Sequence, residues 1–181
     1  MTENTNSKFP SEADVVIVGV GGIVGSMIAY WLSELGQKNI VGLEKSSVIP
    51  SDIASTAHAS DFVYNTTHDK LGCWTTAYSR KFYEDNGFFL KKGGLEICRK
   101  GDDARWEELK RKVGSGKAFG TNVRLISAAE AKEKFPLLDE ESLMGAMWDP
   151  DAGLVIPRSQ DVVSFAVESA KDKGALKTFT D

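Results

Sequence analysis

The sequence has few cysteines, few histidines and no long apolar run. Cys73 and Cys98 are its only cysteines, with neither a CxxC pair nor zinc-like spacing. We therefore expect reduced thiols in a cytoplasmic protein rather than a disulfide framework. His58 and His68 are too few for a histidine-based metal site, so no metal is predicted. No apolar stretch approaches the length of a membrane span.

The sequence also lacks an excess of basic residues. It carries 22 Lys and Arg against 26 Asp and Glu, a formal net charge of −4. This balance disfavours nucleic acid as a partner. Residues 1–12 contain neither an apolar core nor an arginine, so they match neither a secretory signal nor a transit peptide. We expect them to form a disordered lead-in.

What the sequence does contain is an apolar run that leads into clustered glycines. Val15–Val18 predict a central parallel strand that is buried on both faces. Glycines between residues 19 and 25 let the backbone turn sharply and approach a phosphate closely. A helix is expected over residues 25–35, with Gly36 closing it in the left-handed conformation. Its N-terminal N–H groups would face that phosphate.

An acidic residue completes this pattern. Residues 39–43 predict a second strand, and Glu44 follows directly at its end. A carboxylate at this position accepts hydrogen bonds from both ribose hydroxyls, and its charge repels a 2′-phosphate, so NADP is not expected. Strand, glycine loop, helix and Glu44 together predict a dinucleotide-binding βαβ unit.

The glycine spacing is irregular. A strict G-x-G-x-x-G frame that ends at Gly25 places Val20 at the first glycine. A frame that starts at Gly19 contains one extra residue, and we favour it because Gly19 follows the strand directly. The alternative interpretation is a glycine-rich turn that binds no ligand.

The rest of the chain predicts a mixed α+β segment and then a return to the first sheet. The fold class is α/β: a partial, truncated Rossmann-like βαβ unit with a mixed α+β insertion. The expected helices are 75–84, 104–113, which Gly114 and Gly116 end, 161–173, and one that a Ser127–Glu130 capping box opens and Pro136 stops. The expected strands are 88–90 and 95–98, which form a hairpin around Gly93-Gly94, together with 123–126, 143–148 and 175–179.

Further motifs occur in a definite order along the chain. They are Glu44-Lys45, Ser55-Thr56-Ala57-His58-Ala59, Gly93-Gly94-Leu95-Glu96, Phe135-Pro136-Leu137-Leu138, and Asp151-Ala152-Gly153 with Pro157. With the glycine loop, they resemble the D-amino-acid-oxidase-like FAD-dependent oxidoreductases. Within that family the resemblance is to the sarcosine dehydrogenase and dimethylglycine dehydrogenase/oxidase branch. It implies that residues 13–181 are the N-terminal part of a FAD-binding oxidoreductase domain whose remainder lies C-terminal.

The resemblance also implies the cofactor and its contacts. FAD would be bound in an extended form, with the pyrophosphate at the glycine loop and the adenosine at Glu44. Ser55 and Thr56 would donate to phosphate or flavin oxygens. In the sarcosine and dimethylglycine branch, the histidine of this motif is bonded covalently to the 8α-methyl group of the flavin. In this sequence that histidine is His58. The implied cofactor-binding residues are Gly19, Gly21, Gly22, Ile23, Val24, Gly25, Glu44, Lys45, Ser55, Thr56 and His58.

Two positions depart from the pattern of that branch. Ala54 and Asp61 stand where the branch usually has glycine, before Ser55 and three residues after His58. A neutral imidazole is a competent nucleophile towards the electrophilic flavin methyl group. The alternative interpretation of His58 is a loop histidine that caps a backbone carbonyl.

By resemblance, the protein is a FAD-dependent oxidoreductase that oxidises an N-methyl amine of a glycine derivative by hydride transfer to the flavin. Its partner is then a small-molecule amine, and no catalytic residue is identified in this chain. Two alternatives stay open: a noncatalytic, truncated nucleotide-binding fragment, and an NAD-dependent dehydrogenase domain. An incomplete sheet would leave an apolar edge exposed, so we also expect association through that edge.

Overall fold

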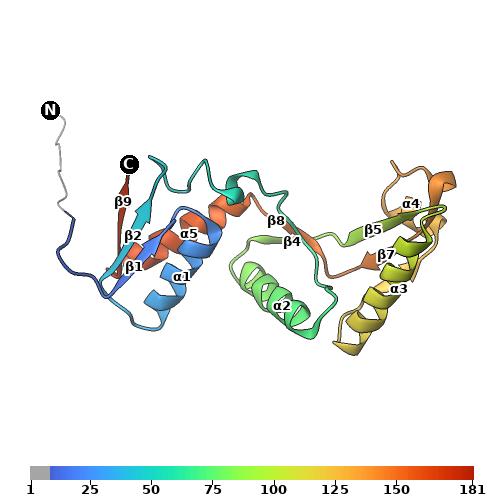
Figure 1. Cartoon of the computed structure of the whole chain (residues 1–181), viewed down its shortest axis with the longest axis horizontal. Helices are drawn as coiled ribbons and strands as arrows, with labels where there is room; N and C mark the ends of the chain where they lie inside the picture. The colour runs from blue at the N-terminus through green and yellow to red at the C-terminus, as the bar shows by residue number, and fades with distance from the viewer. Residues whose placement is uncertain (1–8) are drawn as a thin grey trace. The chain divides into compact units, whose positions relative to one another are not determined.

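The computed structural model describes residues 9–181, which form two compact units (Figure 1). One unit comprises the chain up to Ala59 together with Arg158–Asp181, and the other comprises Ser60–Pro157. The second unit is therefore inserted into the first, as the sequence predicts. Of the predicted lead-in 1–12, residues 1–8 lie outside the described residues.

The first unit is built on a three-stranded parallel sheet. Its strand order is β1 (Val15–Val18), β2 (Ile40–Glu44) and β9 (Leu176–Thr180). Helix α1 (Ile23–Glu34) connects β1 to β2, and α5 (Ser159–Asp172) leads into β9. The predicted βαβ unit is thus present, with helix and strand boundaries shifted by one or two residues.

Both helices cover the same face of this sheet, as Figure 1 shows. They pack on each other through one core, which includes Ile17 from β1, Ile40 from β2 and Val163 from α5. Ala29 of α1 is fully buried in this core. Its small side chain lets the helix approach the strands closely.

Strand β1 differs from the prediction. It lies at the edge of the described sheet, and its residues are not buried on both faces. Ile17 faces the helices, whereas Val16 and Val18 point to the uncovered face and are 54% and 82% exposed. The apolar run correctly predicted the strand, but within residues 9–181 no element covers its second face.

The inserted unit contains two antiparallel sheets. One has the order β3 (Phe62–Val63), β8 (Gly153–Val155), β4 (Phe89–Lys91), and the other the order β5 (Gly94–Arg99), β7 (Leu143–Asp149), β6 (Arg124–Ile126). Its helices are α2 (Lys70–Asp85), α3 (Asp103–Ala118) and α4 (Ala128–Lys134), with a short 3₁₀ turn η2 (Glu140–Ser142).

The predicted hairpin around Gly93-Gly94 is wrong. β4 pairs with β8, and β5 pairs with β7. Gly93 adopts a φ of 77°, and the chain turns there from one sheet into the other. Two strands separated by a glycine turn need not pair with each other when other strands compete for their edges.

The predicted end of α3 is also wrong, because the helix continues through Gly114 and Gly116 to Ala118. A Cβ at Gly116 would come within 2.6 Å of the Thr121 hydroxyl and 2.7 Å of Val123. This glycine therefore permits close packing inside the helix rather than ending it. By contrast, the Ser127–Glu130 capping box of α4 is present as predicted.

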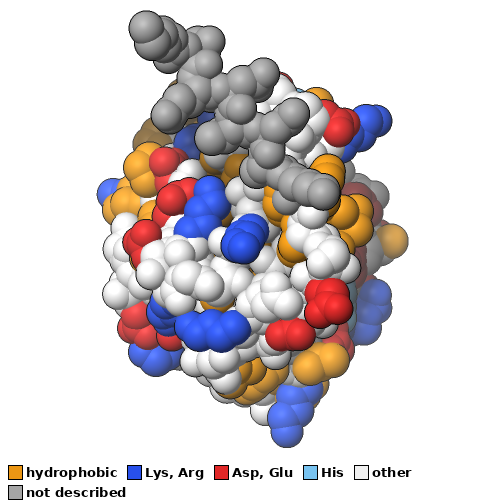
Figure 2. Space-filling model, turned by 90° about the vertical axis from the view of Figure 1, so that its left-hand side faces the viewer, with side chains coloured by type: hydrophobic (Ala, Val, Ile, Leu, Met, Phe, Trp, Pro, Cys, Tyr) orange, Lys and Arg blue, Asp and Glu red, His pale blue; other side chains and the backbone are white. Residues whose placement is uncertain are grey.

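On the face that Figure 2 presents, acidic, basic and hydrophobic side chains are interspersed. Among the described residues, no helix combines the length and apolar character that crossing a bilayer requires.

Candidate cofactor site

The glycine loop lies between the carboxyl end of β1 and the start of α1. Gly19 has a φ of 87°, a conformation that L side chains rarely adopt. A Cβ at Gly25 would overlap the carbonyl oxygen of Gly19, so α1 approaches the strand more closely than an alanine would allow. A Cβ at Gly22 would meet only ordinary contacts, 3.6 Å from Ala54 and 3.8 Å from Thr56. Glycine is therefore needed at position 19 for its backbone conformation and at position 25 for close packing, and the frame that starts at Gly19 includes both positions.

The extra residue of this loop is absorbed at Gly21. Its N–H donates a 2.9 Å hydrogen bond to Oε2 of Glu44, and its carbonyl accepts one from the N–H of Ser51, also at 2.9 Å. A Cβ at Gly21 would lie 2.6 Å from that carboxylate oxygen and 2.8 Å from Cβ of Ser51. Both backbone groups of Gly21 are thus held, one by the last residue of β2 and the other by the segment that follows it.

The first turn of α1 presents N–H groups at the same place. The Ile23 N–H donates to the hydroxyl oxygen of Thr56 at 3.0 Å. The N–H groups of Val24 and Gly25 have no acceptor within residues 9–181. Free N–H groups in the first helical turn, with the positive end of the helix dipole behind them, form a binding place for a phosphate.

Glu44 is held as a carboxylate. Burial raises its pKa, but hydrogen bonds from the N–H groups of Ser46 and Gly21 outweigh burial, and the pKa lies below its ordinary value. Each carboxylate oxygen carries two lone pairs. The bonds to Gly21 and Ser46 therefore leave acceptor capacity for ribose hydroxyls.

A cavity of about 270 Å³ opens beside Glu44 at the carboxyl ends of the three parallel strands. Open parallel sheets bind their ligands at this end. Lys45, which the resemblance counts among the cofactor-binding residues, also lines this cavity. The other walls are Phe9, Val18, Leu43, Phe179, Thr180 and Asp181. The sequence could not relate the last three to Glu44, because they lie in or next to β9, far away in the chain.

The Ser55–His58 segment forms a 3₁₀ turn, η1, in the same unit. Thr56 is buried, whereas Ser55 and His58 are exposed. The His58 imidazole makes no hydrogen bond within the described part of the chain, so it does not cap a carbonyl there. The structure thus brings the glycine loop and Thr56 together directly, and Ser55 and His58 share that turn.

The two departures from the expected pattern differ in consequence. Ala54 has a φ of −71° and a ψ of 150°, an extended conformation in which alanine is unstrained. Asp61 has a φ of 61°, where glycine is favoured and aspartate is among the better tolerated L residues. The backbone at position 61 therefore has the conformation that a glycine would serve.

These groups fit a dinucleotide. Val24 and Gly25 offer unpaired helix N–H groups to a pyrophosphate, and Glu44 offers acceptors to a ribose. The cavity at the strand ends has apolar walls, including Leu43 and Phe179, suited to a flat ring. No group of three or more His, Cys, Asp or Glu side chains suited to a metal ion occurs among residues 9–181.

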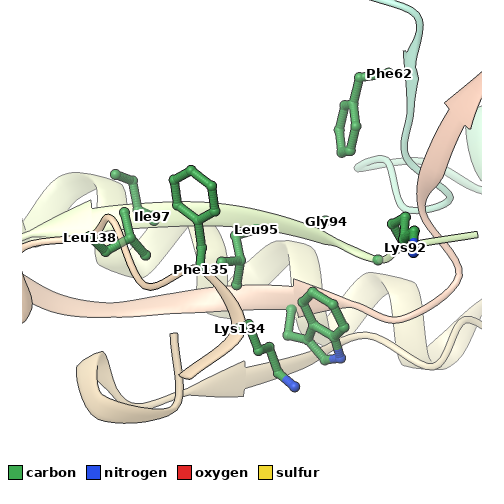
Figure 3. Close-up of a pocket in the computed structure, with 10 residues that line it drawn as sticks. Phe62, Lys92, Gly94, Leu95, Ile97, Lys134, Phe135 and Leu138 are labelled. Carbon is green, nitrogen blue, oxygen red and sulfur yellow. The ribbon is translucent and has the colours of Figure 1, made fainter. Parts of the chain in front are cut away.

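In the inserted unit, the Gly93-Gly94 pair makes room for aromatic rings. A Cβ at Gly93 would overlap the Trp148 ring, and one at Gly94 would lie 2.5 Å from the Phe62 ring. These residues border an apolar groove of about 620 Å³, which Figure 3 shows with Phe135, Leu138, Leu95 and Ile97. The motif is thus a packing element in this structure.

Two acidic residues of the recognised motifs have structural partners in the inserted unit. Glu96 pairs with the buried Lys112 and, at 2.9 Å, with Arg105, which joins β5 to α3. Asp151 pairs with Lys91 and accepts from the Asn122 side-chain amide at 2.8 Å.

The family follows from a comparison with known proteins. The family model described as "FAD dependent oxidoreductase" (DAO) matches residues 14–179. The chain therefore belongs to the DAO family of FAD-dependent oxidoreductases. The alternative of an NAD-dependent dehydrogenase domain is set aside by this match.

Named relatives cover most of this chain. Human mitochondrial sarcosine dehydrogenase is 28% identical over 87% of it, and human mitochondrial dimethylglycine dehydrogenase is 27% identical over 96%. A mouse protein named pyruvate dehydrogenase phosphatase regulatory subunit, mitochondrial, is 29% identical over 94%. The chain spans only 17%, 20% and 19% of the length of these three relatives, respectively.

Solved structures show the same fold. L-proline dehydrogenase from P. horikoshii matches with a TM-score of 0.81 and 28% identity over 94% of this chain. Glycine oxidase from Bacillus cereus ATCC 14579 matches with a TM-score of 0.74 and 26% identity over 93%. The chain covers 44% and 46% of those two chains.

Proposed function

We propose that this chain supplies the FAD-binding part of an oxidoreductase that oxidises an N-methyl amine of a glycine derivative. The observation that carries the cofactor assignment is the meeting of the glycine loop, Glu44 and Thr56 at one end of the parallel sheet. The substrate class rests on the names of the sarcosine and dimethylglycine dehydrogenases among its relatives.

Each part of the site has a distinct binding task. The N–H groups of Val24 and Gly25 hold the pyrophosphate, with Gly19, Gly21, Gly22 and Ile23 shaping the loop. Glu44 accepts from the ribose, and Lys45 borders the adenosine cavity. Ser55 and Thr56 offer hydroxyl donors. When bound, the flavin supplies the hydride acceptor, and the protein supplies orientation.

His58 is the proposed point of covalent attachment to the flavin 8α carbon. Its support is the exposed imidazole, which has no hydrogen bond within residues 9–181 and shares a turn with Thr56. Attachment would replace one imidazole N–H and one methyl C–H bond with an N–C bond, and dioxygen would take up the two electrons and two protons as hydrogen peroxide.

Acid precipitation tests this attachment. The chain incubated with FAD is expected to yield a yellow pellet, and the His58→Ala variant a colourless pellet with the flavin in the supernatant. His68→Ala is the matched control, since His68 contacts Glu108 in the inserted unit and is expected to behave as the wild type. Acid-stable flavin that persists in His58→Ala overturns the assignment.

The substrate class is tested by anaerobic addition of sarcosine or dimethylglycine to the FAD-loaded protein. The expected result is bleaching of the long-wavelength flavin absorption band by these amines and not by glycine, which carries no N-methyl group. Because the chain spans about a fifth of its curated relatives, the same assay on the longer natural protein locates the parts that turnover requires.

A noncatalytic nucleotide-binding role is the second candidate. It is favoured by one relative that is named as a regulatory subunit and is as similar as the dehydrogenases. FAD binding without bleaching by any N-methyl amine, in both the chain and the longer protein, would favour this role over the enzymatic one.

A further inference from the structure

The feature that the function above leaves unexplained is a hydrogen bond between two segments far apart in the sequence. The Thr56 hydroxyl oxygen accepts from the Ile23 N–H at 3.0 Å, across a separation of 33 residues. Ile23 is the first residue of α1, and Gly22, which precedes it, offers no side chain to cap the helix. Thr56 therefore satisfies one of the first N–H groups of α1 from a distant segment, in place of a local N-cap side chain.

The Thr56 end of this link is buried. Thr56 is only 9% exposed, and its turn lies against α5 as well as against the start of α1. One lone pair of the hydroxyl receives the Ile23 N–H, while its own O–H has no acceptor within residues 9–181. That proton is available to an anion at the N–H groups of Val24 and Gly25.

His58 lies in the same 3₁₀ turn as Thr56. The backbone of this turn is closed by hydrogen bonds from the N–H of Ala57 to the carbonyl of Ala54 and from the N–H of Ala59 to the carbonyl of Thr56. Fixing Thr56 to the start of α1 therefore fixes the place of His58 relative to the phosphate-binding N–H groups.

We propose that Thr56 is a positioning residue whose hydroxyl holds the Ser55–His58 turn against the N-terminus of α1. This contact places His58 at the distance from the helix N-terminus at which it can bond to a flavin whose pyrophosphate lies there. This proposal rests on the FAD-binding function proposed above. It gives Thr56 a task beyond donating to the cofactor, and the task is already performed before FAD binds.

Three variants test it. Thr56→Val keeps the shape and removes the hydroxyl, and Thr56→Ser keeps the hydroxyl. Thr66→Val is the matched control, because Thr66 is also buried but its hydroxyl bonds Thr121 in the inserted unit. Thermal unfolding of each apoprotein tests whether the variants are folded.

The first readout is amide hydrogen exchange of Ile23 in the apoprotein. Exchange is expected to accelerate roughly tenfold in Thr56→Val, the size of effect given by losing one helix cap, and to stay near the wild-type rate in Thr56→Ser and Thr66→Val. Unchanged Ile23 exchange in Thr56→Val overturns the link, whatever FAD does.

The second readout separates positioning from simple loss of stability. At saturating FAD, Thr56→Val is expected to form acid-stable flavin at least about tenfold more slowly than the wild type, with FAD affinity also reduced by roughly tenfold. Wild-type rates in Thr56→Val overturn the positioning role. If the wild-type chain binds no FAD, the proposed function is wrong. Faster Ile23 exchange in Thr56→Val would in that case still support the link between the turn and the helix.

Discussion

The N–H of Gly21 donates to the carboxylate of Glu44 across 2.9 Å, and this bond connects the irregular glycine loop to the end of the second strand. The residue that departs from the usual glycine spacing is therefore anchored by the same side chain that is expected to hold the ribose. The enlarged loop is a defined structure, and its binding capacity depends on Glu44.

The Glu44 carboxylate predicts a pH dependence. Because hydrogen bonds lower its pKa in the folded protein, its stabilising contribution is full above the unfolded value of about 4.3 and is lost as the pH falls through the folded value. We expect the wild type to unfold at a higher temperature than Glu44→Gln near neutral pH. The difference should shrink in acid, and a difference that stays constant across this window would count against the assignment. Thermal unfolding over a pH series measures it.

Substitution of two neighbouring glycines should have unequal effects on stability. Gly25→Ala places a methyl group against the Gly19 carbonyl and is expected to cost about 1–3 kcal/mol in the free energy of unfolding. Gly22→Ala meets only contacts of 3.6 Å or more and is expected to cost under about 1 kcal/mol. Chemical denaturation of the two variants provides the comparison, and equal losses would contradict the packing described here.

The Gly93 turn gives a second matched pair. Gly93 and Gly87 both have a positive φ, but a Cβ at Gly93 meets the Trp148 ring, while one at Gly87 enters open space. Alanine at either site costs about 1–2 kcal/mol for the left-handed backbone. Gly93→Ala is expected to cost about 1–3 kcal/mol more, because Trp148 must move. Denaturation and tryptophan fluorescence report both effects, and similar losses at the two sites would refute a role for the ring.

The uncovered side of β1 predicts self-association. Val18 is 82% exposed beside a strand edge that no other strand of the described sheet occupies. Sedimentation over a concentration series is expected to show association of the wild type that Val18→Lys reduces. Leu35→Lys is the control, because Leu35 is equally exposed but follows α1 rather than lying in the edge strand. Equal association of all three proteins would place the contact elsewhere.

Much of the first unit was predictable from the sequence, because its signals are local. The apolar run before Gly19, the helix ended by Gly36 and the strand before Glu44 each follow from neighbouring residues. The resemblance to a family of FAD oxidoreductases predicted the family correctly.

What the sequence did not reveal depends on distant contacts. The pairing of β4 with β8, the burial of Gly116 and the capping of α1 by Thr56 join residues that local patterns cannot relate. Phe179 was missed as a wall of the cavity beside Glu44 for the same reason. The role of His58 and the cytoplasmic location stay predictions.

The most direct test of this account is a titration of the purified, folded chain with FAD, followed by quenching of flavin fluorescence. We predict saturable binding of one FAD per chain and its loss in Gly21→Val, whose side chain would occupy the space beside Glu44 and Ser51. A folded wild-type chain that shows no saturable FAD binding would contradict it.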